Sequence, residues 1–570
     1  MDRIAAEHAA AAKAAARQLT LATQADGMSD GSPLLERGET PEIRFAALSD
    51  AAALHDALQG KPPLTDVQRT ALAQVLADAA AHQNDPGFLH DFFDAAGVDV
   101  STLPTALTGD AKGPDDYTKQ IAGKVGGLIA AAAAAGQLSS GAFAQLSSAK
   151  DPFSAAMFMK YGPAGKSYGQ GQGAAFLAAL TQNIEHLVQG DGYHGLTYAD
   201  FDEVTPILQR CAENGLAARM ALGDGSPAAA ELARDLLVSE SAGGGVDEFG
   251  PFDAGASQNQ YSPTEGVAEA NLLLAAGIPN PADGMSDFHG NDPYGMAAAL
   301  NVLSAAADMH TYAPGAVLVS PVQNAMSQYM NTYIDDIAKS SQSVGRGLTG
   351  YPPGSLSVAA GDVPALLDTV YSDTDQLRVY KTGVGKEMMA ALAATGGHTT
   401  APLAHIDSLT SLYGIVNKAE TGRITDAAAL QDANAADRLM LVNLATGVYG
   451  NASFTSVWHN GFQPIAGGLG AVAPQWFDTG HLQAAQAQVH ASNIGEQRSV
   501  QLMTVQALYN SGTLTDDQKE SMSSIVIDGK VTNNVAFNDW YDANEGTMTL
   551  GGETLQKLET DMLVRFGWQQ

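Results

Sequence analysis

Short polar residues followed by proline recur along this chain, and they constrain its fold more than any other feature. An Asp, Ser or Thr can cap a helix by accepting a hydrogen bond from its first turn, and proline at the first helical position loses no needed amide donor. We therefore expect helices to begin at seven such pairs: Asp85-Pro86, Asp151-Pro152, Thr205-Pro206, Ser226-Pro227, Ser262-Pro263, Asp292-Pro293 and Ser320-Pro321. Capping boxes at three-residue spacing add support: Thr65/Gln68, Ser262/Glu265, Ser320/Gln323 and Thr515/Gln518.

Apolar residues follow these starts at helical spacing. One stripe comprises Leu64, Val67, Ala71, Val75 and Ala79, and a second comprises Val322, Met326, Met330, Tyr333 and Ile337. The alternation typical of strands is nearly absent; short segments such as 316–319 and 525–527 suit strands, but they have no evident hairpin partner. The sequence thus predicts an all-α protein with several subdomains, built from short capped helices and helical hairpins.

A chain of 570 residues is too long for one core, because single domains stop growing near ~250 residues. Segments rich in glycine and proline divide it. We expect an N-terminal helix and linker over 1–60, helical subdomains over 61–220, 221–320 and 321–500, and a C-terminal helical segment over 501–570.

The charge balance excludes several classes of partner. Basic residues number 29 and acidic residues 62, giving a net charge of −33. Nucleic acids and anionic membranes require a concentrated basic surface, so neither is expected as a ligand. A protein partner with basic patches is compatible with this charge.

Cys211 is the only cysteine, which excludes an intramolecular disulfide and any site built from several thiolates. The amino terminus lacks the apolar core of a signal peptide. Residues 125–149 carry no charge but consist mostly of Ala, Gly and Ser, so we interpret them as a buried helix and expect no integral membrane insertion. Localisation in the bacterial cytoplasm, or export by a route other than the general secretory pathway, fits these features.

Two motifs that carry chemistry elsewhere have simpler interpretations here. The segment Gly27 to Gly31 matches a nucleophile elbow around Ser29, but no apolar strand precedes it, and its partial copy at Ser286 lacks the final glycine. The segment Gly162 to Ser167 ends in Gly-Lys-Ser, yet two residues separate its glycine from the Gly-Lys pair where a phosphate loop has four. We predict turns or helix connections at both places.

Metal and cofactor sites are not predicted. The 13 histidines are scattered, without the three-residue gap that places two imidazoles on one helical face for zinc. The loop around Asp191 and Gly192 lacks the alternating oxygen ligands of a calcium loop. We therefore assign no catalytic residue, no cofactor and no metal ligand.

The segment from Leu439 to Phe477 contains no charged residue, although the chain is strongly acidic. It holds two of the four tryptophans and is interrupted by glycines. One interpretation is a core helix followed by a packed loop. The other is a partner-binding patch, because interfaces favour aromatic residues and exclude charge. Its candidate binding residues are Trp458, Phe462, Trp476 and Phe477.

The segments 85–93, 151–165 and 292–306 share an Asp-Pro pair, an aromatic residue and an amphipathic helix. Through them, residues 40–450 resemble the uncharacterised helical proteins of high-GC actinobacteria that are commonly found downstream of WXG-type hairpins and are associated with type VII secretion. The resemblance implies no catalytic residue. None of the four tryptophans is followed by x-Gly, so we expect either an export hairpin upstream or export with a partner.

The resemblance implies a non-enzymatic helical scaffold, adaptor or carrier for a secreted protein partner. Two alternatives stay open at this point. One is a structural protein of a phage or contractile injection particle, which would also be acidic, large and poor in cysteine. The other is a hydrolase that uses Ser29 or an acidic pair whose position the sequence does not give.

Overall fold

The computed structural model confirms the all-α class. It describes residues 40–58, 64–108, 113–189, 204–238, 263–281, 285, 287–289, 292–312, 318–341, 345–350, 353–394, 401–426, 429–430, 433–434, 438, 440–441 and 495–566. These residues form two compact units, one extending to Gly277 and the other beginning at Ile278, with residues 241–244 grouped with the second. The division of the chain into smaller subdomains remains a prediction.

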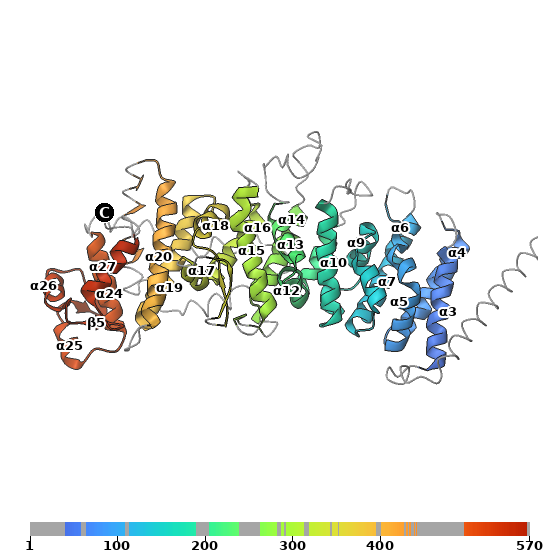
Figure 1. The fold of residues 1–570 in the computed structure, drawn as a ribbon, viewed down its shortest axis with the longest axis horizontal. Coiled ribbons are helices and arrows are strands. Elements are labelled where there is room, and N and C mark those ends of the chain that lie inside the picture. Colours follow the sequence, from blue (N-terminus) through green and yellow to red (C-terminus); the bar gives the residue numbers. More distant parts are fainter. Residues whose placement is uncertain are drawn as a thin grey trace, which may run out of the picture. The chain divides into compact units, whose positions relative to one another are not determined.

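Unit 1 consists of helices in its described part (Figure 1). They are α3 (Pro41–Leu58), α4 (Asp66–Ala81), α5 (Pro86–Ser101), α6 (Leu103–Thr108), α7 (Asp116–Ala134), α8 (Ser140–Ser147), α9 (Pro152–Tyr161), the 3-10 helix η1 (Gly165–Tyr168), α10 (Gln172–Gln189), α11 (Thr205–Ala212), α12 (Gly215–Gly223), α13 (Pro227–Val238) and α14 (Pro263–Gly277).

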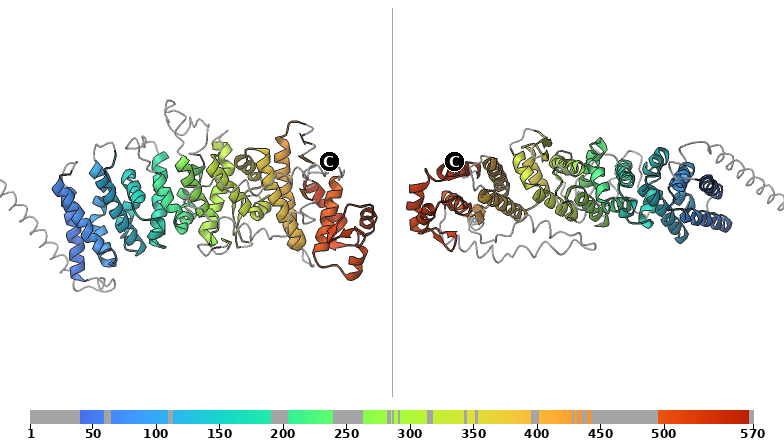
Figure 2. Two further views of the ribbon diagram at one scale, coloured as in Figure 1. Left: turned by 180° about the vertical axis from the view of Figure 1, so that it is seen from behind. Right: turned by 90° about the horizontal axis from the view of Figure 1, so that it is seen from below.

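Each helix of unit 1 packs mainly on helices close to it in the sequence. α3 lies against α4 and α5, α7 against α9, and α10 against α11 and α12, while α14 packs on α11 and α12 (Figure 2). Large aromatic side chains fill the interior, including the stacked rings of Phe88 and Phe92, whose centroids are 5.8 Å apart. Such nearest-neighbour packing lets each helix pair bury its apolar face on the next.

In the part that the structure describes, unit 2 combines helices with three small antiparallel hairpins. Its elements are α15 (Pro293–Tyr312), α16 (Ser320–Thr332), α17 (Ile334–Ser340), β1 (Gly347–Gly350), β2 (Pro353–Ser357), α18 (Asp362–Val370), α19 (Thr374–Ala394), α20 (Ala401–Gly422), α24 (Glu496–Asn510), α25 (Asp516–Ser521), β3 (Val526–Ile527), β4 (Lys530–Val531), α26 (Val535–Asn544), β5 (Thr549–Leu550), β6 (Glu553–Thr554) and α27 (Leu555–Phe566).

Long helices form the middle of unit 2. α19 packs along α20, α24 lies against α19 and α27, and α17 and α18 contact α20. The β1–β2 hairpin pairs Leu348 with Leu356 and packs on α15 and α17. The β3–β4 hairpin is attached to α24 by Gln506, whose side-chain amide donates to the Gly529 carbonyl and accepts from the Val531 amide.

The predicted caps are confirmed where the structure describes them, with two exceptions. Asp85, Asp151 and Asp292 accept hydrogen bonds from the first turns of α5, α9 and α15. Ser226 caps α13, and the capping boxes at Thr65 and Thr515 are present. The predictions at Thr205 and Ser320 were wrong by one residue, because each is the first residue of its helix and the N-caps are Val204 and Val319.

Ser320 therefore does not form a capping box with Gln323, whose side-chain amide instead donates to the Val370 carbonyl at 3.0 Å. Ser262 lies outside the described residues. In the described part of the chain, no helix is long and apolar enough to cross a membrane. Residues 125–149 belong to α7 and α8 and the turn between them, and most apolar side chains of this stretch are buried, as predicted.

The two predicted apolar stripes have different outcomes. All five residues of the 322–337 stripe are buried. Of the first stripe, Leu64, Val75 and Ala79 are buried, but Val67 is 79% exposed and Ala71 is also exposed, and Leu72 and Leu76 complete the buried face of α4. The 525–527 segment does have a hairpin partner, since β3 pairs with β4 across Asp528 and Gly529, whose φ angles of 51° and 77° suit a tight primed turn. Leu318 and Val319 are not in a strand.

Candidate functional site

The residues predicted to bind a partner, Trp458, Phe462, Trp476 and Phe477, lie outside the described residues. Ser29 and Ser286 also lie outside them. The structure does describe Met440 and Leu441, near the start of the uncharged segment, and both side chains are buried in unit 2. The contacts of Met440 therefore show where the described part of this segment lies in unit 2.

The Gly-Lys-Ser loop connects α9 to α10 through η1, as predicted. The Gly165 amide, which would face a phosphate in a nucleotide-binding loop, donates to the Glu213 carboxylate at 2.6 Å. Arg210 holds the same carboxylate at 2.7 Å and also donates to the Met159 carbonyl. A Cβ on Gly165 would lie 1.9 Å from the Arg210 carbonyl oxygen, so the loop is closed against α11. A carboxylate occupies the position that an anion would need.

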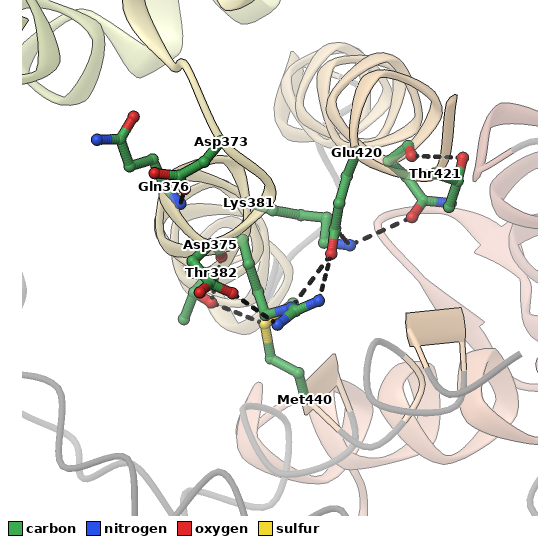
Figure 3. Close-up of polar contacts among 10 residues, drawn as sticks. Asp373, Asp375, Gln376, Lys381, Thr382, Glu420, Thr421 and Met440 are labelled. Atoms are coloured by element: carbon green, nitrogen blue, oxygen red, sulfur yellow. Dashed lines mark hydrogen bonds and ion pairs between the residues drawn. The ribbon is translucent and has the colours of Figure 1, made fainter. Parts of the chain in front are cut away.

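A buried charged cluster lies between α19 and α20, and we define it as Arg378, Lys381, Asn417 and Glu420 (Figure 3). Lys381 and Glu420 are both completely buried. Each of these two residues lies in an otherwise apolar stripe on one face of its helix. The stripe on α19 comprises Leu377, Lys381, Val384 and Met388, and the stripe on α20, with the same spacing, comprises Leu409, Tyr413, Val416 and Glu420. The pairing of these two helices brings the two charges together.

Hydrogen bonds satisfy the charges of this cluster. The Lys381 ammonium pairs with the Glu420 carboxylate and donates to the Asn417 side-chain carbonyl at 3.2 Å. Arg378 donates to Glu420 through Nε at 3.1 Å and Nη2 at 2.9 Å, and its Nη1 reaches Asp375 at 3.2 Å. A buried charge is tolerated only when it is paired and hydrogen-bonded, and the cluster meets this condition.

Met440 reaches the same place from the segment that follows α20. Its sulfur accepts a hydrogen bond from Thr382 at 2.9 Å, and Thr382 follows Lys381 directly on α19 (Figure 3). Two residues earlier, Arg438 forms an ion pair at 3.4 Å with Glu496, the first residue of α24. We call these two contacts the root, because they hold the residues on either side of 442–494 close together on unit 2.

The cluster and the root anchor the chain and supply no accessible reactive group. The Lys381 nitrogen is buried and engaged with Glu420 and Asn417, so it does not act as a nucleophile in this arrangement. Among the described residues, no group of His, Cys, Asp and Glu side chains could hold a metal ion. Burial raises the pKa of the Cys211 thiol to about 12, so this thiol is unreactive at neutral pH.

A hollow of about 350 Å³ lies in unit 1 where α5, α8 and α9 meet. Gln145, Ser148, Lys150 and Phe158 contribute to its lining. Two of its polar side chains already bond within the protein: Ser148 donates to the Gln145 carbonyl, and Asp151 accepts from Thr105 and the Ser154 amide. The hollow therefore does not present a preformed set of polar ligands.

Comparison of the chain with protein-family models, with curated proteins and with solved structures finds no match.

The charged cluster and the root were not predicted from the sequence. The available signal was a charged residue on an otherwise apolar stripe, at Lys381 in α19 and at Glu420 in α20. A charge in such a position must find a partner on the facing helix, because an unpaired buried charge is strongly destabilising. That rule predicts that each charge has a partner, although it does not say which helix supplies it.

Proposed function

We propose that this protein is a non-enzymatic helical scaffold, an adaptor or carrier for a secreted protein partner, of the type VII secretion-associated class that its sequence resembles. The observation that carries the proposal is the root. Arg438 and Glu496 are 58 positions apart and form an ion pair. The described residues on both sides of 442–494 are thereby held at one position on unit 2.

Several helices of unit 2 contribute to the root. Met440 bonds to α19, Arg438 bonds to α24, and α19 packs on both α20 and α24. Thr382, which donates to Met440, directly follows Lys381 of the buried Lys381–Glu420 pair on α19. A binding segment benefits from such a base, because sites carried on a rigid framework lose less entropy when a partner binds.

The composition of the attached segment supports a role in docking. From Leu439 to Phe477 the chain has no charged residue, in a protein of net charge −33. Aromatic side chains and depletion of charge characterise the centres of protein interfaces, and the proposed contact residues are Trp458, Phe462, Trp476 and Phe477. The acidic remainder of the chain would favour a partner with basic patches around such a contact.

The experiment is replacement of residues 442–494 by a short Gly/Ser linker in the otherwise intact chain. We expect the thermal transition to change little and capture of the native partner from the host to be lost. A matched control replaces Val67 of α4, which is 79% exposed, with alanine. Capture that is equal in the linker variant and the full chain would contradict the proposal.

Single-tryptophan variants test the same proposal without removing the segment. We expect acrylamide to quench at least one of Trp458 and Trp476, and its substitution by alanine should abolish capture with folding nearly unchanged. If the segment is core instead, both rings will be protected and Trp458→Ala will cost about 3–5 kcal/mol.

Genes beside this one separate the secretion role from the phage alternative: secretion ATPase genes support the former and tail genes the latter.

A further inference from the structure

The imidazole of His289 lies between two carboxylates that belong to different parts of unit 2. Its Nδ1 is 2.5 Å from Asp287 Oδ1, and its Nε2 is 3.0 Å from Asp336 Oδ2. Asp287 precedes α15, whereas Asp336 lies in α17. An ionised carboxylate can only accept a hydrogen bond, so both ring nitrogens donate and the ring is an imidazolium.

The groups around this ring favour its positive charge. Asp336 is 2% exposed, and its Oδ1 has no hydrogen-bond partner among the described residues. Tyr333, at the start of α17, is buried near Asp287, Asp292 and Asp336, and burial together with these negative charges raises the pKa of its hydroxyl. The hydrogen bond to Asp336, followed by the one to Asp287, raises the pKa of His289 to about 9, against the opposing effect of partial burial.

Two acidic side chains close to this site are engaged with other groups. Asp335, next to Asp336 in α17, pairs with His405 of α20 at 3.4 Å. Asp292 accepts from the amides of Tyr294 and Gly295 in the first turn of α15. Loss of the proton from His289 would therefore leave the buried Asp336 without its cation.

The residues joined to His289 fit closely over the start of α15. The Phe288 side chain is 1% exposed, and its carbonyl accepts from the Asp292 amide at 3.1 Å. A Cβ on Gly295 would lie 2.6 Å from the Phe288 ring, so this ring fills the space beside the helix. A change at His289 would be transmitted to the buried Phe288 next to it.

We propose that His289 is a proton-dependent clasp that fastens residues 287–289 to α17, closed when the imidazole carries both protons and open when it has lost one. A neutral imidazole can donate to one carboxylate only, and its other nitrogen then directs a lone pair at the second carboxylate. The proton passes to solvent base, the contact with Asp336 becomes repulsive, and Phe288 leaves its site beside Gly295.

The direction of the pH dependence follows from the raised pKa. The unfolded imidazole titrates near ~6.5 and the folded one near about 9. The stabilisation by the clasp is therefore fully present below about pH 6.5 and is lost as the pH rises through about 9.

Nuclear magnetic resonance of the full chain with labelled histidine tests the protonation directly. The His289 signal, assigned by its absence in His289→Gln, is expected to titrate near pH 9, and the Asp336→Asn variant should move its midpoint down toward ~6.5. His405→Gln is the matched control and should leave the His289 midpoint unchanged. A midpoint at or below 6.5 in the unmodified chain, or one that Asp336→Asn does not move, would overturn the proposal.

Cleavage by chymotrypsin after Phe288 tests the opening itself. We expect the rate, normalised to a peptide with the same sequence, to rise more than tenfold between pH 7 and pH 9, following the fraction of neutral imidazole. In His289→Gln the normalised rate should be high and independent of pH. A rate that stays constant in the unmodified chain, or one that changes equally in both proteins, would contradict a clasp. If His289→Gln does not fold, Asp336→Asn provides the same comparison.

Discussion

The ammonium group of Lys381 and the carboxylate of Glu420 are paired in the interior of unit 2, although 39 positions separate them in the sequence. Both side chains are completely buried. Solvent does not screen this pair, so removal of one partner should cost more free energy of unfolding than it would for an ion pair on the surface.

Substitution of one member of this pair is expected to be strongly destabilising. Lys381→Met or Glu420→Gln should lower the free energy of unfolding by about 3–5 kcal/mol, because the first leaves the buried Glu420 with Arg378 as its remaining cation and the second removes the carboxylate that is paired with the buried Lys381 ammonium. The control Lys557→Met removes an exposed lysine that pairs with Glu553 and should have little effect. Urea denaturation followed by circular dichroism measures the difference. Equal effects of the two lysine substitutions would show that burial of Lys381 is irrelevant.

The aspartate caps should each contribute measurably to stability. Replacement of Asp85, Asp151 or Asp292 by alanine should cost about 0.5–2 kcal/mol, because each leaves amides of a first helical turn without an acceptor. Asp151 should be at the upper end, since it also accepts from Thr105 and Ser154 side chains. Ser320→Ala is the control, because Ser320 does not cap α16. Unchanged melting temperatures in all three aspartate variants would contradict these assignments.

The Gly-Lys-Ser loop should not bind nucleotide. ATP with magnesium is expected to give no thermal shift, because Glu213 already occupies the Gly165 amide and would repel a phosphate. A stabilisation by ATP that disappears in Lys166→Ala would refute this prediction. Gly165→Ala should destabilise unit 1 through its clash with the Arg210 carbonyl, whereas Gly113→Ala, where the added carbon meets open space, should not.

Glu387 should make unit 2 less stable as the pH rises through neutrality. Burial, with repulsion from Asp335 as a second cause, raises the pKa of Glu387 from 4.5 to about 7. The folded state thus holds this proton more tightly than the unfolded state does, so its contribution is fully present below pH 4.5 and is lost as the pH approaches 7. Glu387→Gln should reduce the fall in melting temperature between pH 5 and 6.5, below the range in which His289 titrates, whereas Glu520→Gln on α25 should not. If the melting temperature of Glu387→Gln falls with pH as steeply as that of the unmodified chain, groups other than Glu387 cause the fall.

The features that the sequence predicted correctly are those determined by neighbouring residues. Asp85 and Asp151 were identified as caps because the signal is local. The capping residue, the proline after it and the backbone amide that donates to the cap all lie within four positions. The predicted start of α16 was one residue late, because the N-cap is Val319. In α4, the exposed Val67 and the buried Leu72 are both apolar, so periodicity alone did not show which of them faces the core. The β3–β4 turn did have a local signal, Asp528-Gly529, which is a favoured hairpin pair.

The charged cluster, the root and the His289 contact depend on tertiary structure. Lys381 and Glu420 meet only because α19 packs on α20, and Arg438 reaches Glu496 across 58 positions. Local patterns contain no information about which helices pair. The sequence did mark the uncharged segment from Leu439, and the structure adds the position on unit 2 where that segment begins.

The packing of α27 on α20 determines the order in which unit 2 can fold. Arg565 pairs with Asp407 at 2.9 Å, the rings of Tyr413 and Phe566 are 5.1 Å apart, and the Gly414 backbone lies against Arg565. These contacts span about 150 positions, whereas the helices of unit 1 pack mainly on near neighbours in the sequence. Contacts of short range form quickly, and distant ones wait for a long loop to close. During synthesis, therefore, unit 1 can fold while the rest of the chain is still being made, but α20 keeps an apolar face uncovered until α27 has emerged from the ribosome.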